Sequence, residues 1–244
     1  MDSFIDSLVT TAVSAGISCS FIFILALWRR SWSIAKLGLG VFSLFLLDGI
    51  AVHLPRLIGL DGIYWAVSGK FLQLLVFFLA ARELFRVQVQ RPRGEKWWMW
   101  VPIITVLTLL PSFLLQEGLL TKPLGLEWGL YQATLPGLAE EIIYRGIILT
   151  MLDQSLGRSI KLFGVRWGLG VVITTLQFYF AHCFTLTPEF SIQIQWSALP
   201  DFVLYGVCMC WLHYRFESVW PSILTHNLHN LILVSLPLLT TQEL

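Results

Sequence analysis

The residues best suited to chemistry are Glu140, Glu141 and Arg145, which stand in the otherwise apolar run LAEEIIYRG at residues 138–146. An ionisable side chain at membrane depth is energetically costly, so three of them this close together indicate a function. At α-helical spacing Glu141 and Arg145 share one face and can form an ion pair. Glu140 points to a different face, and a carboxyl group in apolar surroundings can act as a general base or acid. We therefore expect Glu140 to do chemistry and the pair to support it.

Two later segments carry polar side chains that can assist a carboxylate base. Phe178 and His182 are four residues apart and share a helix face, and His226 and Asn230 have the same spacing. Taken singly, each segment fits interhelical hydrogen bonding at least as well as catalysis. Together with Glu140 they supply a base, two imidazoles and an amide, which suffice to activate water and stabilise an oxyanion on a carbonyl. No hydroxyl or thiol nearby has an evident base partner, so direct attack by water is favoured over an acyl-enzyme.

The elements that position these groups are predicted to be membrane-spanning helices. The chain of 244 residues is 56% hydrophobic and 13% charged, with a mean hydropathy of +0.73, whereas soluble domains are about 25% charged. We predict an all-α fold, a polytopic transmembrane bundle of about eight helices, forming a single integral-membrane domain over residues 1–244. The apolar runs place the helices at residues 4–28, 37–53, 63–81, 97–115, 131–152, 167–184, 199–214 and 221–239.

The charges of the connecting loops predict the orientation of these helices. Twelve of the sixteen Lys and Arg residues fall in alternate loops, after the first, third, fifth and seventh helices, whereas the opposite loops hold only Arg56 and Lys122. The basic residues counted in the loop after the third helix include Arg86. The positive-inside rule places the basic loops in the cytoplasm and both termini outside. We therefore expect a multi-pass protein of the plasma membrane, bacterial in origin, and expect the mixed basic and apolar segment 153–166 to lie along the cytoplasmic surface.

The three polar segments resemble the motifs of the CPBP family, the ABI and type II CAAX prenyl endopeptidase family of intramembrane proteases. The family pattern is EExxxR, followed by FxxxH and then by HxxxN or HxxxD. In this chain the pattern is matched by Glu140, Glu141 and Arg145, by Phe178 and His182, and by His226 and Asn230. The resemblance covers residues 130–233, and three motifs in the family's order make it fairly specific.

The resemblance implies an endopeptidase that hydrolyses a peptide bond of a membrane-associated protein or peptide, lipidated in the family's eukaryotic substrates. In that scheme Glu140, helped by His182, activates a water molecule. His226 and Asn230 then stabilise the oxyanion, while Phe178 and the remaining motif residues support the site. The expected partners are membrane lipid and this substrate. The net charge of +1 gives no basic field for nucleic acid.

Three alternatives stay open at the level of sequence. Family members are also described as metalloproteases, and zinc bound by Glu140, His182 and His226 with a water in the fourth position is the metal-dependent version. Asn230 is a poor zinc ligand and the chain has no HExxH motif, so we expect no cofactor and keep zinc as the alternative. A non-catalytic membrane scaffold or immunity protein would use the same groups as interhelical hydrogen bonds. A proton-relaying transporter is the third alternative.

Overall fold

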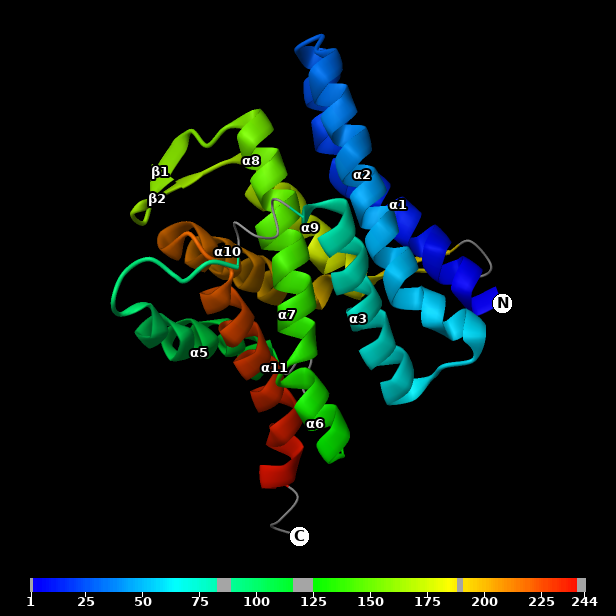
Figure 1. Cartoon of the computed structure of the whole chain (residues 1–244), viewed down its shortest axis with the longest axis vertical. Coiled ribbons are helices and arrows are strands. Elements are labelled where there is room, and N and C mark those ends of the chain that lie inside the picture. Colours follow the sequence, from blue (N-terminus) through cyan, green and yellow to red (C-terminus); the bar gives the residue numbers. More distant parts are fainter. Residues whose placement is uncertain (1, 83–88, 116–124, 188–190, 241–244) are drawn as a thin grey trace. The chain divides into compact units, whose positions relative to one another are not determined.

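The computed structural model describes residues 2–82, 89–115, 125–187 and 191–240 of the chain (Figure 1). Arg86 and Lys122, which entered the loop-charge argument, lie outside these residues. The described chain is an all-α helical bundle with two short hairpins, so the predicted fold class is confirmed. Its α-helices are α1 (Asp2–Trp28), α2 (Trp32–His53), α3 (Gly62–Ala80), α5 (Trp97–Leu115), α6 (Leu126–Gln132), α7 (Leu135–Glu141), α8 (Thr150–Leu156), α9 (Leu169–Cys183), α10 (Leu199–Phe216) and α11 (Trp220–Thr240).

The remaining elements are short. A π-helix, η2 (Ile142–Leu149), joins α7 to α8, and two 3-10 helices, η1 (Leu54–Ile58) and η3 (Trp196–Ala198), precede α3 and α10. Two antiparallel hairpins pair β1 (Ile160–Leu162) with β2 (Val165–Trp167), and β3 (Phe184–Leu186) with β4 (Ile192–Ile194). Neither hairpin is predicted from the sequence.

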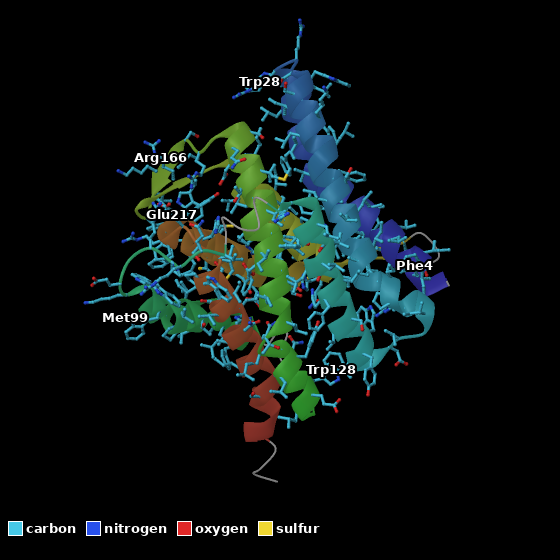
Figure 2. All side chains as sticks on the ribbon, viewed as in Figure 1. Phe4, Trp28, Met99, Trp128, Arg166 and Glu217 are labelled. Atoms are coloured by element: carbon cyan, nitrogen blue, oxygen red, sulfur yellow. The ribbon has the colours of Figure 1, made fainter. Side chains whose placement is uncertain are left out.

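Four helical stretches in the described part of the chain are long and apolar enough to cross a membrane. They are Phe4–Trp28, Trp32–Ile58, Gly62–Ala80 and Trp97–Leu114. Figure 2 labels Phe4 and Trp28 at the two ends of the first stretch. These four stretches agree with the first four predicted spans, because an uninterrupted run of about 20 apolar residues is a strong helix signal in a membrane setting.

The chain divides into two compact units, each made of two separate stretches of sequence. Unit 1 contains Met1–Val76 and Ile148–Trp196, and unit 2 contains Phe77–Ile147 and Ser197–Leu244. The chain therefore passes between the units within α3, within η2 and after Trp196. Because neither unit is continuous in sequence, no linker composition marks a boundary between them.

Unit 1 is built on the antiparallel pair α1 and α2, which run side by side (Figure 1). Helix α9 packs on α1, and the β3–β4 hairpin is joined to α1 where Leu186 N donates to Thr10 Oγ1 at 3.3 Å. The apolar core of the unit includes Phe45 and Ile22. It also buries Asp48, which accepts a hydrogen bond from Gln73 Nε2.

Unit 2 is built around α11, which contacts α5, α6 and α7, while α10 packs on both α5 and α11 (Figure 1). Ile142, Ile143 and Ile147 of η2 are buried together with Met209 and Leu212 of α10. The ionisable groups Glu140, Glu141, Arg145 and His226 are buried in the same unit. The core of unit 2 therefore holds the ionisable groups in low-dielectric surroundings.

The predicted helix at residues 131–152 is wrong in its continuity, because the structure divides this stretch into four elements. Helix α6 ends at Gln132 and α7 begins at Leu135, with Pro136 in its first turn. Proline has no N–H, so Pro136 cannot donate to the carbonyl of Gln132 four residues earlier, as a continuous α-helix requires. Proline in the first turn of a new helix avoids that loss.

Candidate active site

The first motif lies where the backbone changes from α-helix to π-helix. Glu140 and Glu141 are the last two residues of α7, and Arg145 lies in η2, which begins at Ile142. A π-helix bonds each N–H to the carbonyl five residues back, so its turns are wider than those of an α-helix, and such segments recur at functional sites. The two carboxylates thus sit at the last turn before the wider helix.

Glu141 and Arg145 form the ion pair expected from their spacing. Arg145 Nη1 donates to Glu141 Oε1 at 3.1 Å, and both side chains are 0% exposed. An ion pair without access to water is stable only when the two charges meet with good geometry. Residues four apart lie near one face in an α-helix and in a π-helix, so the ion pair can form across the change from one to the other.

His226 of α11 reaches both carboxylates of the first motif. Its Nδ1 lies 2.8 Å from Glu141 Oε1, and its Nε2 lies 3.9 Å from Glu140 Oε2. An ionised carboxylate can only accept hydrogen bonds, so Nδ1 carries the proton in the contact with Glu141. The neutral ring then offers Nε2, the nitrogen nearer Glu140, as an acceptor. His226 therefore connects the supporting pair to the proposed base.

The distance between His226 Nε2 and Glu140 Oε2 suits a bridging water. At 3.9 Å the two atoms are too far apart for a direct hydrogen bond. Two hydrogen bonds of about 2.8 Å that meet at an oxygen with an angle of about 90° span about 4 Å. A water in that position would contact an acceptor nitrogen and a carboxylate together, which is the arrangement that general-base catalysis needs.

Asn227, beside His226, fixes the start of α7. Its Oδ1 accepts from Gly137 N at 2.9 Å, and its Nδ2 donates to Thr134 O at 2.9 Å. The first N–H groups of a helix have no partner inside the helix, and Asn227 supplies one from a neighbouring helix. Thr134, the residue at the cap position, makes no side-chain capping bond itself. This contact holds α7 and α11 in register one turn before Glu140.

Asn230 and His229, the next polar residues of α11, have partners within unit 2. Asn230 Nδ2 donates to Gln132 Oε1 of α6 at 3.0 Å, and an amide nitrogen carries a second hydrogen for a further acceptor. His229 Nδ1 contacts Thr108 Oγ1 of α5 at 3.1 Å. Asn230 is thus held at the edge of the α6–α11 contact, and His229 is turned toward α5.

Tyr205 of α10 packs edge-on against both histidines of α11. Its ring centroid lies 5.3 Å from that of His226, at an interplanar angle of 86°, and 5.2 Å from that of His229, at 71°. Edge-to-face aromatic contacts restrict the rotation of the rings involved. Tyr205 therefore helps to hold the His226 ring in the plane that reaches Glu140 and Glu141.

The second motif lies in unit 1, at the end of α9. His182 Nδ1 contacts Phe178 O at 2.8 Å, and the two ring centroids are 4.6 Å apart. A carbonyl oxygen can only accept, so Nδ1 carries the proton and the neutral ring presents Nε2 as the acceptor. His182 is exposed within the structure. Its tautomer therefore suits a role as acceptor toward water, and its position relative to Glu140 remains an expectation.

The zinc alternative takes its ligands from both units, with Glu140 and His226 in unit 2 and His182 in unit 1. No group of three or more His, Cys, Asp or Glu side chains in the described chain is placed to hold a metal ion. Glu141 Oε1 is instead engaged by Arg145 and His226, and a guanidinium beside a metal ligand would compete with the cation.

Residues 122–232 match the family model of the type II CAAX prenyl endopeptidase Rce1-like proteins. This match supports the CPBP family for this stretch of the chain. The match covers all three motifs and thereby confirms the resemblance carried by the sequence. No curated protein and no solved structure matches the chain. The family supports a CAAX-type protease, and together with the four apolar helices it supports a membrane protein.

Several residues that shape the site were missed in the sequence analysis. Gln132 and Tyr205 contact the motif residues Asn230 and His226, and Asn227 holds the start of α7 before the first motif, all from positions that no motif spacing specifies. Asn227 had a weak signal, since a polar residue flanked by His226 and Leu228 in a span requires a hydrogen-bond partner. Gln132 and Tyr205 had none, because their contacts arise from the packing of separate helices.

Proposed function

We propose that this protein is an intramembrane endopeptidase of the glutamate type, which hydrolyses a peptide bond of a membrane-associated protein or peptide. The observation that carries the proposal is the placement of the His226 ring between Glu140 and Glu141 in the core of unit 2. The family match adds the substrate class, a CAAX-type and therefore lipidated peptide. A carboxylate, an imidazole and a buried counter-charge in this arrangement are the components of a water-activating site.

In the proposed reaction, Glu140 removes a proton from a water that also contacts His226 Nε2, with His182 assisting as acceptor. The oxygen of that water then attacks the carbonyl carbon, and the negative charge moves to the carbonyl oxygen. Asn230 Nδ2 has an N–H to donate to this oxyanion. His226 is the second group that we expect beside this oxyanion, which it would approach through Nε2, the ring nitrogen nearer Glu140.

The second half of the reaction returns the proton. Breaking the C–N bond releases an amine that needs a hydrogen, and Glu140, protonated in the first step, supplies it. The products are a carboxylic acid and an amine, and Glu140 is again ionised. Throughout the cycle Glu141 stays bonded to Arg145 and to His226 Nδ1, so it orients the imidazole without exchanging a proton with the substrate.

The experiment that tests this function measures cleavage of an internally quenched, farnesylated CAAX peptide by the full chain in lipid nanodiscs. We expect Glu140→Gln and His226→Ala to lower turnover by about 10²- to 10⁴-fold, the usual contribution of a general base and its partner. His182→Ala is expected to lower turnover as well. Glu127→Gln, which alters an exposed carboxylate of α6 in the same unit, is the matched control and should retain native turnover.

Two outcomes would contradict the proposal. Native turnover in Glu140→Gln would remove Glu140 from the mechanism. Loss of folding in Glu140→Gln, measured by size-exclusion chromatography and thermal unfolding, would favour the scaffold alternative, in which the polar groups only join helices. Chelation followed by zinc addition is a further arm, and activity that is lost and then restored by zinc would favour the metal-dependent version.

A further inference from the structure

The β1–β2 hairpin of unit 1 has an apolar face that is exposed along β1 and at the turn. Ile160 pairs with Trp167, and Leu162 pairs with Val165, so these four side chains point to one side of the hairpin. On β1, Ile160 is 64% exposed and Leu162 51% exposed, and Phe163 in the turn is 75% exposed, whereas on β2 Val165 is buried and Trp167 is half-buried. Phe163 also has a φ of 50°, in the left-handed region that large residues rarely adopt. The turn thus displays an aromatic side chain at an energetic cost.

The opposite face of the hairpin is basic. Lys161 and Arg166 are cross-strand partners and both are exposed (Arg166 is labelled in Figure 2). Like charges directly opposite each other destabilise an antiparallel pair unless an anion compensates them. Arg158, just before β1, adds a third cation. The carboxylate that faces this segment is Asp153 of α8, whose Oδ2 lies 3.9 Å from Arg158 Nε, so cations remain in excess.

We propose that this hairpin, defined as residues 160–167, docks on a membrane leaflet rich in anionic lipid. The apolar face and Phe163 enter the boundary between headgroups and acyl chains, while Lys161 and Arg166 bind lipid phosphate groups. Anionic lipid is the partner that fits this hairpin, because its apolar turn matches the hydrocarbon of a leaflet and its paired cations match the negative headgroups above it. The long stems of Lys and Arg let their charges stay at the phosphate level while the hairpin lies flat.

The depth of docking is limited by the hairpin's own backbone. A two-stranded ribbon has outer edges whose N–H and C=O groups need water or headgroup partners, so it cannot enter hydrocarbon. The headgroup region satisfies those groups and still accepts exposed Ile, Leu and Phe side chains. Lipid binding by the hairpin does not depend on peptidase activity. It can therefore be tested by measuring lipid contact instead of peptide cleavage.

The test places an environment-sensitive fluorophore on the hairpin turn. The four native cysteines are buried, so Phe163→Cys offers an exposed thiol for a nitrobenzoxadiazole label in the full chain. In nanodiscs we expect blue-shifted emission, and quenching by brominated phosphatidylglycerol at least about twofold stronger than by brominated phosphatidylcholine. Adding Lys161→Gln and Arg166→Gln should bring the two lipids to equal quenching. Replacing Arg91 and Lys96, exposed in unit 2, by Gln is the charge-matched control and should keep the preference.

Three results would overturn the proposal. The first is an emission maximum at the same long wavelength as that of a label at Glu95→Cys, an exposed polar position. The second is equal quenching by the two lipids in the protein with Lys161 and Arg166 intact. The third is loss of the preference on adding inorganic phosphate but not chloride at matched ionic strength, which would assign the cations to a soluble anion. Thermal unfolding of each variant checks that unit 1 stays folded.

Discussion

Glu140 and Glu141 are identical side chains at consecutive positions, and their surroundings give them different chemistry. Glu141 Oε1 lies 3.1 Å from Arg145 Nη1 and 2.8 Å from His226 Nδ1, so its negative charge is already engaged by two donors. The approach of His226 to Glu140 is longer, at 3.9 Å. Because successive residues of a helix differ by about 100° in direction, the two carboxylates reach His226 from different sides. This difference favours Glu140 as the base and Glu141 as the group that orients the imidazole.

Replacing Arg145 by Met should destabilise the protein strongly. The change leaves Glu141 as a buried carboxylate without its guanidinium partner, and breaking one side of a buried pair costs about 3–5 kcal/mol of unfolding free energy. The double variant Glu141→Gln with Arg145→Met removes both charges and should lose less stability than the single variant. Thermal unfolding in nanodiscs, followed by intrinsic tryptophan fluorescence, measures both. A single variant as stable as the native protein would show that the pair has no structural role.

At the scale of elements, the site depends on how closely α7 approaches α11. A Cβ atom added at Gly137 would overlap Asn227 Oδ1 and lie 2.7 Å from the carbonyl oxygen of Ile223. The absence of a side chain at Gly137 therefore lets the two backbones meet one turn before Glu140. The sequence showed an apolar stretch with a glycine, and the reason for the glycine is visible only in the packing of the two helices.

Gly137→Ala should therefore impair both stability and turnover. The added methyl group pushes α11 away from α7, breaks the Asn227 hydrogen bond to Gly137 N, and moves His226 relative to the carboxylates. A displacement of about 1 Å in a catalytic group lowers turnover by about 10²-fold. The control is Gly129→Ala on α6, where an added Cβ meets nothing within 4 Å. Equal peptide cleavage by the two variants would contradict the importance of this close approach.

At the scale of the whole molecule, sequence predicted the features that depend on local periodicity. The long apolar runs gave four spans whose ends differ from the structure by a few residues, and the spacing of Glu141 and Arg145 gave their ion pair. His226 and Glu140 were brought together in the sequence only as members of one set of groups that can activate water and stabilise an oxyanion. The catalytic roles assigned to these residues stay predictions.

The π-helix, the β1–β2 hairpin and the capping of α7 were not predicted, because none of them depends on the periodic spacing of apolar residues. The π-helix Ile142–Leu149 consists mainly of apolar residues without proline, so nothing in its composition marks the wider turns. The β1–β2 hairpin follows from Gly157 and Gly164, which both adopt positive φ, in a segment too short for a hydrophobic pattern. The capping of α7 by Asn227 needs two helices that are distant in sequence to meet.

The orientation of the whole molecule yields the last prediction. The basic segments after α1 and α3 and at the end of α10, together with the hairpin segment, should face the cytoplasm, because translocating Lys and Arg is unfavourable. Asp61→Cys, in the exposed loop before α3, should then react with a membrane-impermeant maleimide in intact cells. Glu95→Cys, before α5, should react only after the membrane is opened. The native cysteines are buried and give little background. Labelling of Glu95→Cys in intact cells would reverse the topology and place the hairpin at the other leaflet.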